Sequence, residues 1–338
     1  MEKISSKIDK NIKLGIVGSG NISEDYIKVI KFYNHKVLKI VTKTKSKQNI
    51  IFCKKNRIKH HYLSFNKAIN SYPKVDAWII CSTWNTLKKN LSIAIKNNIS
   101  ILIEKSIIVT SKDLLKLKSK LKPNQLNRIS IAYNRNYYDF IPYLIKEIKK
   151  ESLEAIYAYL PESYQSIINK KGLKIKNHLT KYMTSHWITL IYNVLKNSNA
   201  KINLSKKFNY SKKNILSSNL VAFDVNIKNK KIPLIINILP NNPMNINISF
   251  YSKKKTFVLS PVEKLKVYEK IKIIKKNNQN VYIPLSKSLD VNKTFKPGFK
   301  LMYRDFINSC VLKNKKSNYM TKLNDLIDIY KICETIQK

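Results

Sequence analysis

Three of the chain's five glycines lie in GIVGSG, residues 15–20, directly after its first apolar run. A segment with helical spacing follows, so the glycines occupy a strand-to-helix turn. In such a turn Gly18 permits a tight bend, and Gly20, which has no Cβ, lets a phosphate approach the N–H groups at the helix start. The stretch is typical of a dinucleotide-binding turn with an ordinary turn as the alternative, and its candidate binding residues are Gly18, Gly20, Asn21 and Ile22.

The periodicity of the chain changes part-way along it. Up to about residue 134, nearly continuous apolar runs such as 76–82 and 100–106 alternate with amphipathic segments. This pattern predicts a doubly wound parallel sheet of the Rossmann type. From about residue 216, apolar and polar residues alternate strictly, which indicates an antiparallel sheet with one solvated face. We therefore expect an α/β protein with an N-terminal Rossmann domain and a C-terminal α+β domain whose sheet is open and largely antiparallel.

The sequence KPNQLN interrupts the first pattern near residue 125. We therefore predict a dinucleotide-binding domain over residues 1–125 and a second domain over residues 126–338. The last amphipathic segment, residues 322–336, is a candidate to pack back on the first domain.

The formal net charge of +45 raises the question of nucleic-acid binding. Only four of the 65 basic residues are arginine, and the lysines are spread along the whole chain. Readers of bases and phosphates usually rely on clustered arginine and exposed aromatic side chains. The composition therefore predicts weak attraction to polyanions and no specific nucleic-acid partner.

The sequence contains no membrane-spanning run, no signal segment and no closely spaced cysteines, and these features bear on the compartment and on metal binding. No apolar run approaches the roughly 20 residues that span a bilayer. The first residues, MEKISSKIDKN, carry no apolar signal segment. We expect a cytoplasmic protein without a membrane partner. The four cysteines form no closely spaced pair, so they are expected to be buried free thiols, with no disulfide framework and no metal site.

The end of the second predicted strand bears on the choice of dinucleotide. A carboxylate there would bind the adenosine ribose diol and repel a 2′-phosphate. This chain has Thr42, Lys43 and Thr44 instead. Lysine is abundant everywhere in the chain, so the missing acid is the more informative part of the signal. NADP is favoured as the cofactor, with NAD as the alternative.

Several stretches together resemble the glucose–fructose oxidoreductase and inositol dehydrogenase (Gfo/Idh/MocA) family, along almost the whole chain. GIVGSGNIS is similar to its opening fingerprint, and residues 75–117 are similar to its block around the fourth and fifth strands. Glu104-Lys105-Ser106 resembles its Glu-Lys-Pro signature. TSHWITLIYNVL resembles the helix that carries its catalytic histidine, and FKPGFKLMYRDFI resembles its C-terminal segment.

The resemblance implies a dehydrogenase acting on CH–OH groups. A hydride would pass between nicotinamide and a secondary alcohol or ketone of a sugar or nucleotide sugar, in a branch often serving surface-glycan synthesis. His186 would be the acid/base and Lys105 would stabilise developing alkoxide charge. Further cofactor contacts would come from Ser82, Thr83, Trp84, Asn85 and Glu104, and further substrate or phosphate contacts from Asn134 and Arg135. The second domain would hold the substrate and form the dimer surface of a homo-oligomer, a dimer or a tetramer.

Three positions depart from the family pattern. Ser106 replaces the usual proline, while Tyr182 and Thr189 stand where many members carry acids before and after the histidine. Tyr182 and Thr189 remain candidates for substrate contact, and core packing is the alternative for Tyr182. Without a carboxylate, another group must set the tautomer of His186. The alternative function is therefore a catalytically impaired dinucleotide-binding protein of the same fold.

Overall fold

The computed structural model describes residues 11–337 except 212–215, 217, 228–229 and 315–316, and it describes residues 204–211 by their backbone only. The chain forms two compact units. One contains the residues up to Tyr137 together with Lys293–Ile327, and the other contains Tyr138–Asn292 and the residues from Asp328. The sequence boundary near residue 125 coincides with α6 (Pro123–Asn127) inside the first unit, because β6 beyond it still joins the parallel sheet.

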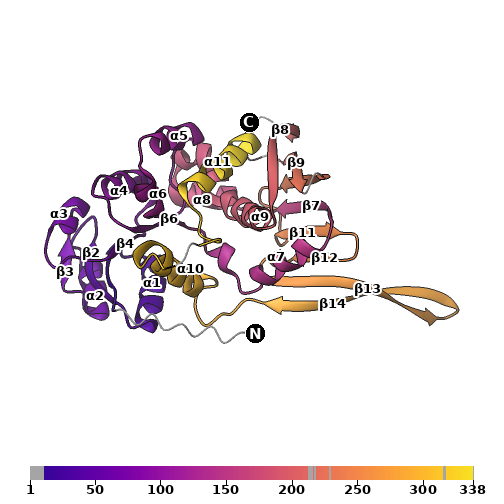
Figure 1. Cartoon of the computed structure of the whole chain (residues 1–338), viewed down its shortest axis with the longest axis horizontal. Coiled ribbons are helices and arrows are strands. Elements are labelled where there is room, and N and C mark those ends of the chain that lie inside the picture. The colour runs from indigo at the N-terminus through magenta and orange to yellow at the C-terminus, as the bar shows by residue number, and fades with distance from the viewer. Residues whose placement is uncertain (1–10, 212–215, 217, 228–229, 315–316, 338) are drawn as a thin grey trace. The chain divides into compact units, whose positions relative to one another are not determined.

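The first unit is built on a six-stranded sheet in the order β3-β2-β1-β4-β5-β6, and all its pairings are parallel. This is the order of a doubly wound dinucleotide-binding fold, in which the strand order reverses between β1 and β4. The predicted fold class is therefore confirmed for this half (Figure 1). The strands are β1 (Lys13–Val17), β2 (Lys36–Val41), β3 (His60–Tyr62), β4 (Ala77–Ile80), β5 (Ile101–Glu104) and β6 (Ile129–Ala132).

Helices connect these strands. The predicted capping box at the start of α5 is present, since Thr110 and Asp113 each accept a hydrogen bond from the other's backbone N–H. Besides α6, the helices of this unit's N-terminal part are α1 (Asn21–Phe32), α2 (Lys47–Asn56), α3 (Phe65–Asn70), α4 (Trp84–Lys96), α5 (Ser111–Ser119) and the 3₁₀ turn η1 (Asn134–Tyr137).

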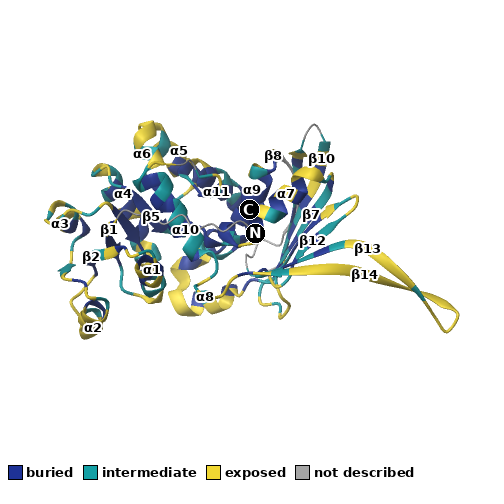
Figure 2. Ribbon diagram, turned by 60° about the horizontal axis from the view of Figure 1, so that its bottom comes forward, coloured by how far each residue is buried: buried dark blue, intermediate teal, exposed yellow. Residues whose placement is uncertain are grey.

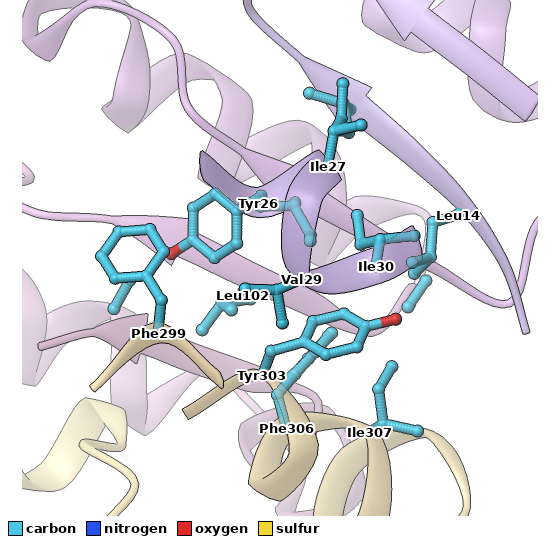
Figure 3. Packing of buried hydrophobic residues seen from close by; sticks show 14 of the residues in the cluster. Leu14, Tyr26, Ile27, Val29, Ile30, Leu102, Phe299, Tyr303, Phe306 and Ile307 are labelled. Carbon is cyan, nitrogen blue, oxygen red and sulfur yellow. The ribbon is translucent and has the colours of Figure 1, made fainter. Parts of the chain in front are cut away.

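A C-terminal segment completes the core of the first unit. Helix α10 (Phe299–Phe306) continues into a π-helical turn, η4 (Ile307–Val311), and both pack on α1 and the sheet. Figure 3 shows Phe299 and Tyr303 of α10 against the α1 face that carries Tyr26 and Val29. The rings of Tyr26 and Phe299 lie 4.8 Å apart between centroids. Residues far apart in sequence thus form one hydrophobic cluster, which makes this segment part of the first unit.

The second unit contains an eight-stranded sheet in the order β14-β13-β12-β11-β7-β10-β9-β8. Its pairings are antiparallel except for β10 with β7, which confirms the predicted mostly antiparallel sheet. The strands are β7 (Leu153–Leu160), β8 (Ala200–Ser211), β9 (Asn219–Ile227), β10 (Lys230–Ile238), β11 (Asn247–Ser252), β12 (Thr256–Leu259), β13 (Lys264–Lys276) and β14 (Gln279–Asp290). The helical segments are α7 (Ile141–Lys150), α8 (Tyr164–Lys171), the 3₁₀ turn η2 (Leu173–His178), the π-helical turn η3 (Thr180–Thr184) and α9 (Ser185–Asn197). Helix α11 (Leu323–Gln337) begins in the first unit and ends in the second.

One face of the second sheet is buried and the other is partly open. Along β9, Val221, Phe223 and Val225 are buried, and the residues between them are half-exposed. The β13–β14 pair continues past its last pairing with β12 as an exposed two-stranded ribbon (Figures 1 and 2). No helix in the described part of the chain is both long and apolar enough to cross a membrane.

Candidate active site

The parallel sheet brings the ends of four strands to one edge. Val17 at the end of β1 pairs with both Val41 of β2 and Ile80 of β4, and Ile80 pairs with Ile103 of β5. The residues that follow each strand therefore lie side by side at the carboxyl edge of the sheet, where doubly wound folds bind ligands. The candidate residues near positions 18, 42, 82 and 105 meet at this edge.

The three glycines of the opening turn have different reasons to be glycine. A Cβ on Gly15 would collide with the ring of Trp78, so this position serves packing of the sheet. Gly18 has a φ of +110°, and a Cβ there would lie 2.7 Å from the carbonyl oxygen of Cys81. Gly20 caps α1, and a Cβ added to it would meet no protein atom within 4 Å. Of these three glycines, Gly20 is therefore the one that opens onto free space at the start of a helix.

The first turn of α1 is suited to an anion. Its leading N–H groups, including those of Asn21 and Ile22, have no intrahelical acceptor by the geometry of any helix. Asn21 is exposed, whereas the side chain of Ile22 packs against the hydrophobic cluster. A pyrophosphate fits here, because the space above Gly20 is open and the helix dipole favours negative charge.

The turn is tied to the beginning of α2. Ser19 donates a hydrogen bond from Oγ to Asn49 Oδ1 at 2.6 Å, and Asn49 donates from Nδ2 to the carbonyl of Thr44 at 2.7 Å. Ser46 caps α2 by accepting from the Asn49 backbone N–H. One asparagine therefore links the glycine turn to the segment that follows β2.

Thr42 contributes to the shape of that segment. Its side chain is 7% exposed, and its hydroxyl donates to the carbonyl of Thr44 at 2.7 Å. The hydroxyl oxygen also lies 2.6 Å from Nε2 of His61, which follows on β3. Thr42 was expected to bind the cofactor, but its polar atoms are used within the protein. It is therefore a residue that positions the segment, and Thr44 presents its side chain to solvent.

The exposed charge at this end of β2 is positive. Lys43, Lys45 and Lys47 are all solvent-exposed, and residues 42–48 contain no carboxylate. The absence of an acid leaves nothing in this segment to repel a phosphate on the 2′-oxygen of the adenosine ribose.

The segment after β4 is ordered by short-range hydrogen bonds. Asn90 of α4 donates to Ser82 Oγ at 2.8 Å, and the hydroxyl of Thr83 donates to Asn85 Oδ1 at 2.7 Å. Trp84 is the first residue of α4 and is half-buried. This segment begins next to Gly18, since a Cβ added to Gly18 would lie 3.3 Å from the backbone nitrogen of Ser82.

The Glu104-Lys105-Ser106 segment follows β5 directly. The carboxylate of Glu104 accepts a hydrogen bond from Tyr26 Oη at 2.7 Å. Desolvation raises the pKa of Glu104, while Tyr26 and the Lys105 ammonium oppose that rise. Glu104 therefore holds α1 against the sheet. Its contact with the cofactor stays a prediction. Lys105 is half-buried, Ser106 is buried, and the peptide bond between them is cis.

Asn134 is the first residue of η1, two residues after β6, and has a structural contact. Its Nδ2 donates to the carbonyl of Pro297 at 2.9 Å, and its side chain is 9% exposed. Its backbone carbonyl is the atom that a Cβ on Gly298 would strike. Asn134 therefore fastens the C-terminal segment to the sheet, and its contact with a substrate stays a prediction. Arg135 follows in η1 and is half-buried.

His186 lies in the second unit, in the first turn of α9 directly after the π-helical turn η3. Its ring is half-buried, and the ring centroid of Trp187 is 6.2 Å away. π-Helical turns occur frequently at functional sites, because they reorient side chains within a helix. Tyr182, in η3, is also half-buried, and burial raises the pKa of its hydroxyl. The two side chains belong to consecutive turns of one helical stretch.

Thr189 has a different role from the one expected. It is 1% exposed, and its hydroxyl donates to the carbonyl of Ser185 at 2.6 Å. A buried hydroxyl bonded to its own helix has no surface to offer a substrate. Thr189 is therefore a packing residue of α9.

A buried polar cluster supports the start of α9. Tyr164 and Thr184 lie 2.6 Å apart through their hydroxyls, and the Lys181 ammonium lies 2.7 Å from the Glu334 carboxylate of α11. The Lys181 side chain is nearly fully buried, and its ammonium also lies over the ring of Tyr330. These contacts fix the backbone just before His186.

Sequence comparison identifies the nucleotide-binding part. Residues 12–132 match the Gfo/Idh/MocA family model, described as the oxidoreductase family with an NAD-binding Rossmann fold. Residues 12–132 are therefore similar to the Gfo/Idh/MocA oxidoreductases. The resemblance noted in the sequence is thereby confirmed, and the cofactor of this family is a nicotinamide dinucleotide. No curated protein matches the chain in sequence.

Solved structures share the fold at low sequence identity. Scyllo-inositol dehydrogenase from Lactobacillus casei is 14% identical, with a TM-score of 0.70 over 97% of this chain and 95% of its own. UDP-N-acetylglucosamine 3-dehydrogenase from Acidithiobacillus ferrooxidans is 12% identical, with a TM-score of 0.69 over 96% of both chains. Myo-inositol 2-dehydrogenase from Lactobacillus plantarum is 13% identical, with a TM-score of 0.70 over 96% of both chains. These three dehydrogenases thus share the fold of both units.

We call the residues that follow β1, β2 and β4 at the carboxyl edge of the parallel sheet the nucleotide edge. The sequence patterns do not reveal two residues that support it, Asn49 and His61. Asn49 lies in α2, which the periodicity did not identify, and His61 lies in a three-residue strand too short to show alternation. A signal existed for Asn49 only: Ser46 stands three residues before it, the spacing at which an N-cap serine accepts a hydrogen bond from a backbone N–H.

Proposed function

We propose that this protein is an NADP-preferring oxidoreductase that transfers a hydride between nicotinamide and a secondary alcohol or ketone of a sugar or nucleotide sugar. One observation carries the proposal. The open N-terminus of α1 at Gly20 lies beside the segment that follows β2, residues 42–48. This segment exposes lysines and contains no carboxylate. The first feature suits the pyrophosphate and the second suits a 2′-phosphate.

The residues of the chain divide the remaining work. The nicotinamide dinucleotide supplies or accepts the hydride when bound. Lys105, at the carboxyl edge of the sheet, would hold a cationic charge near the reacting oxygen and stabilise its developing negative charge. His186 would accept the hydroxyl proton during oxidation and return it during reduction. Tyr182 and Arg135 remain candidates for substrate contact.

The class of substrate is inferred from the dehydrogenases that share the fold. Their names specify inositols and a UDP-linked amino sugar, all of which carry secondary hydroxyl groups on a six-membered ring. We extend that class to this chain. A role in surface-glycan synthesis, a cytoplasmic location and a dimer or tetramer stay predictions.

The cofactor part of the proposal is tested by titrating the protein with NADPH and NADH and following nucleotide fluorescence. The wild-type protein is expected to bind NADPH more tightly. Lys43→Asp should reverse that preference by adding a carboxylate in the segment that follows β2, while Lys89→Asp, an exposed position on α4, serves as the matched control. Equal affinities for the two nucleotides in the wild-type protein would remove the preference for NADP.

The catalytic part is tested with a panel of ring ketones, inositols and nucleotide sugars in the presence of either cofactor. Turnover of one of them is the expected result. Tight NADPH binding without turnover of any compound would favour the alternative, a dinucleotide-binding protein that has lost its catalysis. The buried position of Thr189, where relatives often carry an acid, is the observation that keeps this alternative in view.

A further inference from the structure

The ring of His61 lies against Thr42, the residue that follows β2. Its contact with the Thr42 hydroxyl determines which ring nitrogen carries a hydrogen. The hydroxyl of Thr42 has one proton, and it donates that proton to the Thr44 carbonyl at 2.7 Å. The His61 Nε2 atom lies 2.6 Å from the same hydroxyl oxygen, so Nε2 must carry a hydrogen and donate it. Nδ1 is therefore the nitrogen at which this ring gains or loses a proton.

The charged groups described around His61 are cationic. Burial and the nearby Lys45 ammonium lower the pKa of the ring below its ordinary value. From β2, Thr42 faces the ring, and Lys39 directs its ammonium to the carbonyls of Ala68 and Ser71. Helix α3, which packs on β3, contributes the exposed Lys67. The ring is accordingly neutral near pH 7 in the free protein.

The position of the ring links it to the expected phosphate seat. His61 holds Thr42, Thr42 holds the Thr44 carbonyl, and Asn49 holds that same carbonyl from α2. Lys43 and Lys45 project from the segment that these bonds fix. A doubly charged phosphate among these lysines would offset the field that opposes protonation of the ring.

We propose that His61 is a positioning residue of the NADP site that takes up a proton at Nδ1 when the 2′-phosphate binds. The inference rests on the proposed NADP preference and adds a residue and a pH dependence to it. The proton comes from solvent, and no covalent bond changes. Since the ring binds its proton more tightly in the complex than in the free protein, the affinity of the wild-type protein for the 2′-phosphate, relative to that of His61→Gln, rises as pH falls from about 8 towards 6.

The proton is measured by calorimetric titration with adenosine 2′,5′-bisphosphate at pH 7 in two buffers of different ionisation enthalpy. Adenosine 5′-monophosphate, which lacks the 2′-phosphate, is the control ligand. The wild-type protein is expected to take up on the order of half a proton more with the bisphosphate than His61→Gln does. Glutamine keeps an N–H donor for Thr42 but cannot ionise, so its loss of uptake isolates the ring.

His60→Gln is the matched control, because His60 is the neighbouring histidine of β3 and pairs with Lys39 rather than facing Thr42. An NMR titration of the His61 ring in the wild-type protein, with and without the bisphosphate, gives a second measurement that does not depend on the folding of a variant. A higher pKa in the complex is expected.

Equal proton uptake by the wild-type protein and His61→Gln, with the preference for the bisphosphate intact, would overturn the role of His61 alone. Equal affinity for the bisphosphate and the monophosphate would overturn the NADP site and the role of His61 together. If proton uptake is lost in His60→Gln as well, the uptake does not depend on His61 alone. That result would contradict the role proposed for its contact with Thr42.

Discussion

The nucleotide edge of the first unit and the start of α9 in the second unit are held in different ways. At the nucleotide edge, Ser19, Asn49 and Thr44 are joined by hydrogen bonds at half-exposed or exposed positions. Before His186, the supporting contacts are buried or partly buried, and the pair of Lys181 and Glu334 joins segments 153 residues apart. Substitutions at the nucleotide edge should therefore alter nucleotide affinity while the protein stays folded. Substitutions in the contacts that support the start of α9 should mainly lower the free energy of unfolding.

The largest expected effect separates chemistry from binding. His186→Ala is expected to lower turnover by about 10²- to 10⁴-fold, because a positioned acid/base contributes about that much. NADPH affinity should stay within a few-fold of wild type, since the histidine lies outside the nucleotide edge. Steady-state kinetics and fluorescence titration measure the two quantities. Turnover within a few-fold of wild type would remove His186 from the mechanism.

The next effect tests the buried pair behind α9. Glu334→Gln leaves the Lys181 ammonium buried without this carboxylate, and breaking such a pair costs about 3 kcal/mol of unfolding free energy. Lys331→Gln breaks a half-exposed pair with Asp328 on the same helix and should change stability by less than about 0.5 kcal/mol. Urea unfolding compares the two variants. Similar small losses in both would mean that the cluster does not support α9 as described.

Gly18 and Gly20 lie in one turn but should respond differently to substitution by alanine. Gly18→Ala places a Cβ against the Cys81 carbonyl at positive φ, so it should lower stability by about 1–3 kcal/mol. Gly20→Ala meets no protein atom, so the melting temperature should be nearly unchanged. Its NADPH affinity should nevertheless fall about tenfold, because the added methyl group occupies the expected phosphate approach. Full NADPH affinity in Gly20→Ala would show that the pyrophosphate does not lie there.

The smallest effect is a change in pH dependence at Glu104. Desolvation raises the pKa of this carboxyl in the folded protein above its unfolded value. The folded state therefore holds the proton to higher pH, and stability falls as pH rises from about 4.3, the unfolded value, through the folded pKa. Glu104→Gln should flatten that fall in melting curves taken between pH 4 and 8. Tyr26→Phe, which keeps the carboxyl, should retain it, and an unchanged slope in Glu104→Gln would assign the fall to other groups.

The features that sequence could predict are those whose causes are local. The glycine turn, the capping box at Thr110 and Asp113, and the apolar strand runs each depend on residues a few positions apart. The missing acid after β2 was visible because strand ends in this fold have a known place at the sheet edge.

The features that sequence could not predict depend on distant pairing. The contact of Thr42 with His61 requires the register of β2 against β3, and the packing of Tyr303 requires α10 to return to α1. The buried roles of Asn134 and Thr189 likewise depend on what surrounds them, since both polar side chains are typical of binding sites when exposed.

The central claim is that the nucleotide edge selects NADPH for a reaction completed by His186. The most direct measurement is the oxidation of NADPH and of NADH by the wild-type protein, followed by absorbance across the panel of ring ketones. The account predicts turnover of one ketone with a higher kcat/KM for NADPH, reduced at least a hundredfold in His186→Ala. Turnover that prefers NADH, or that persists in His186→Ala, would contradict it.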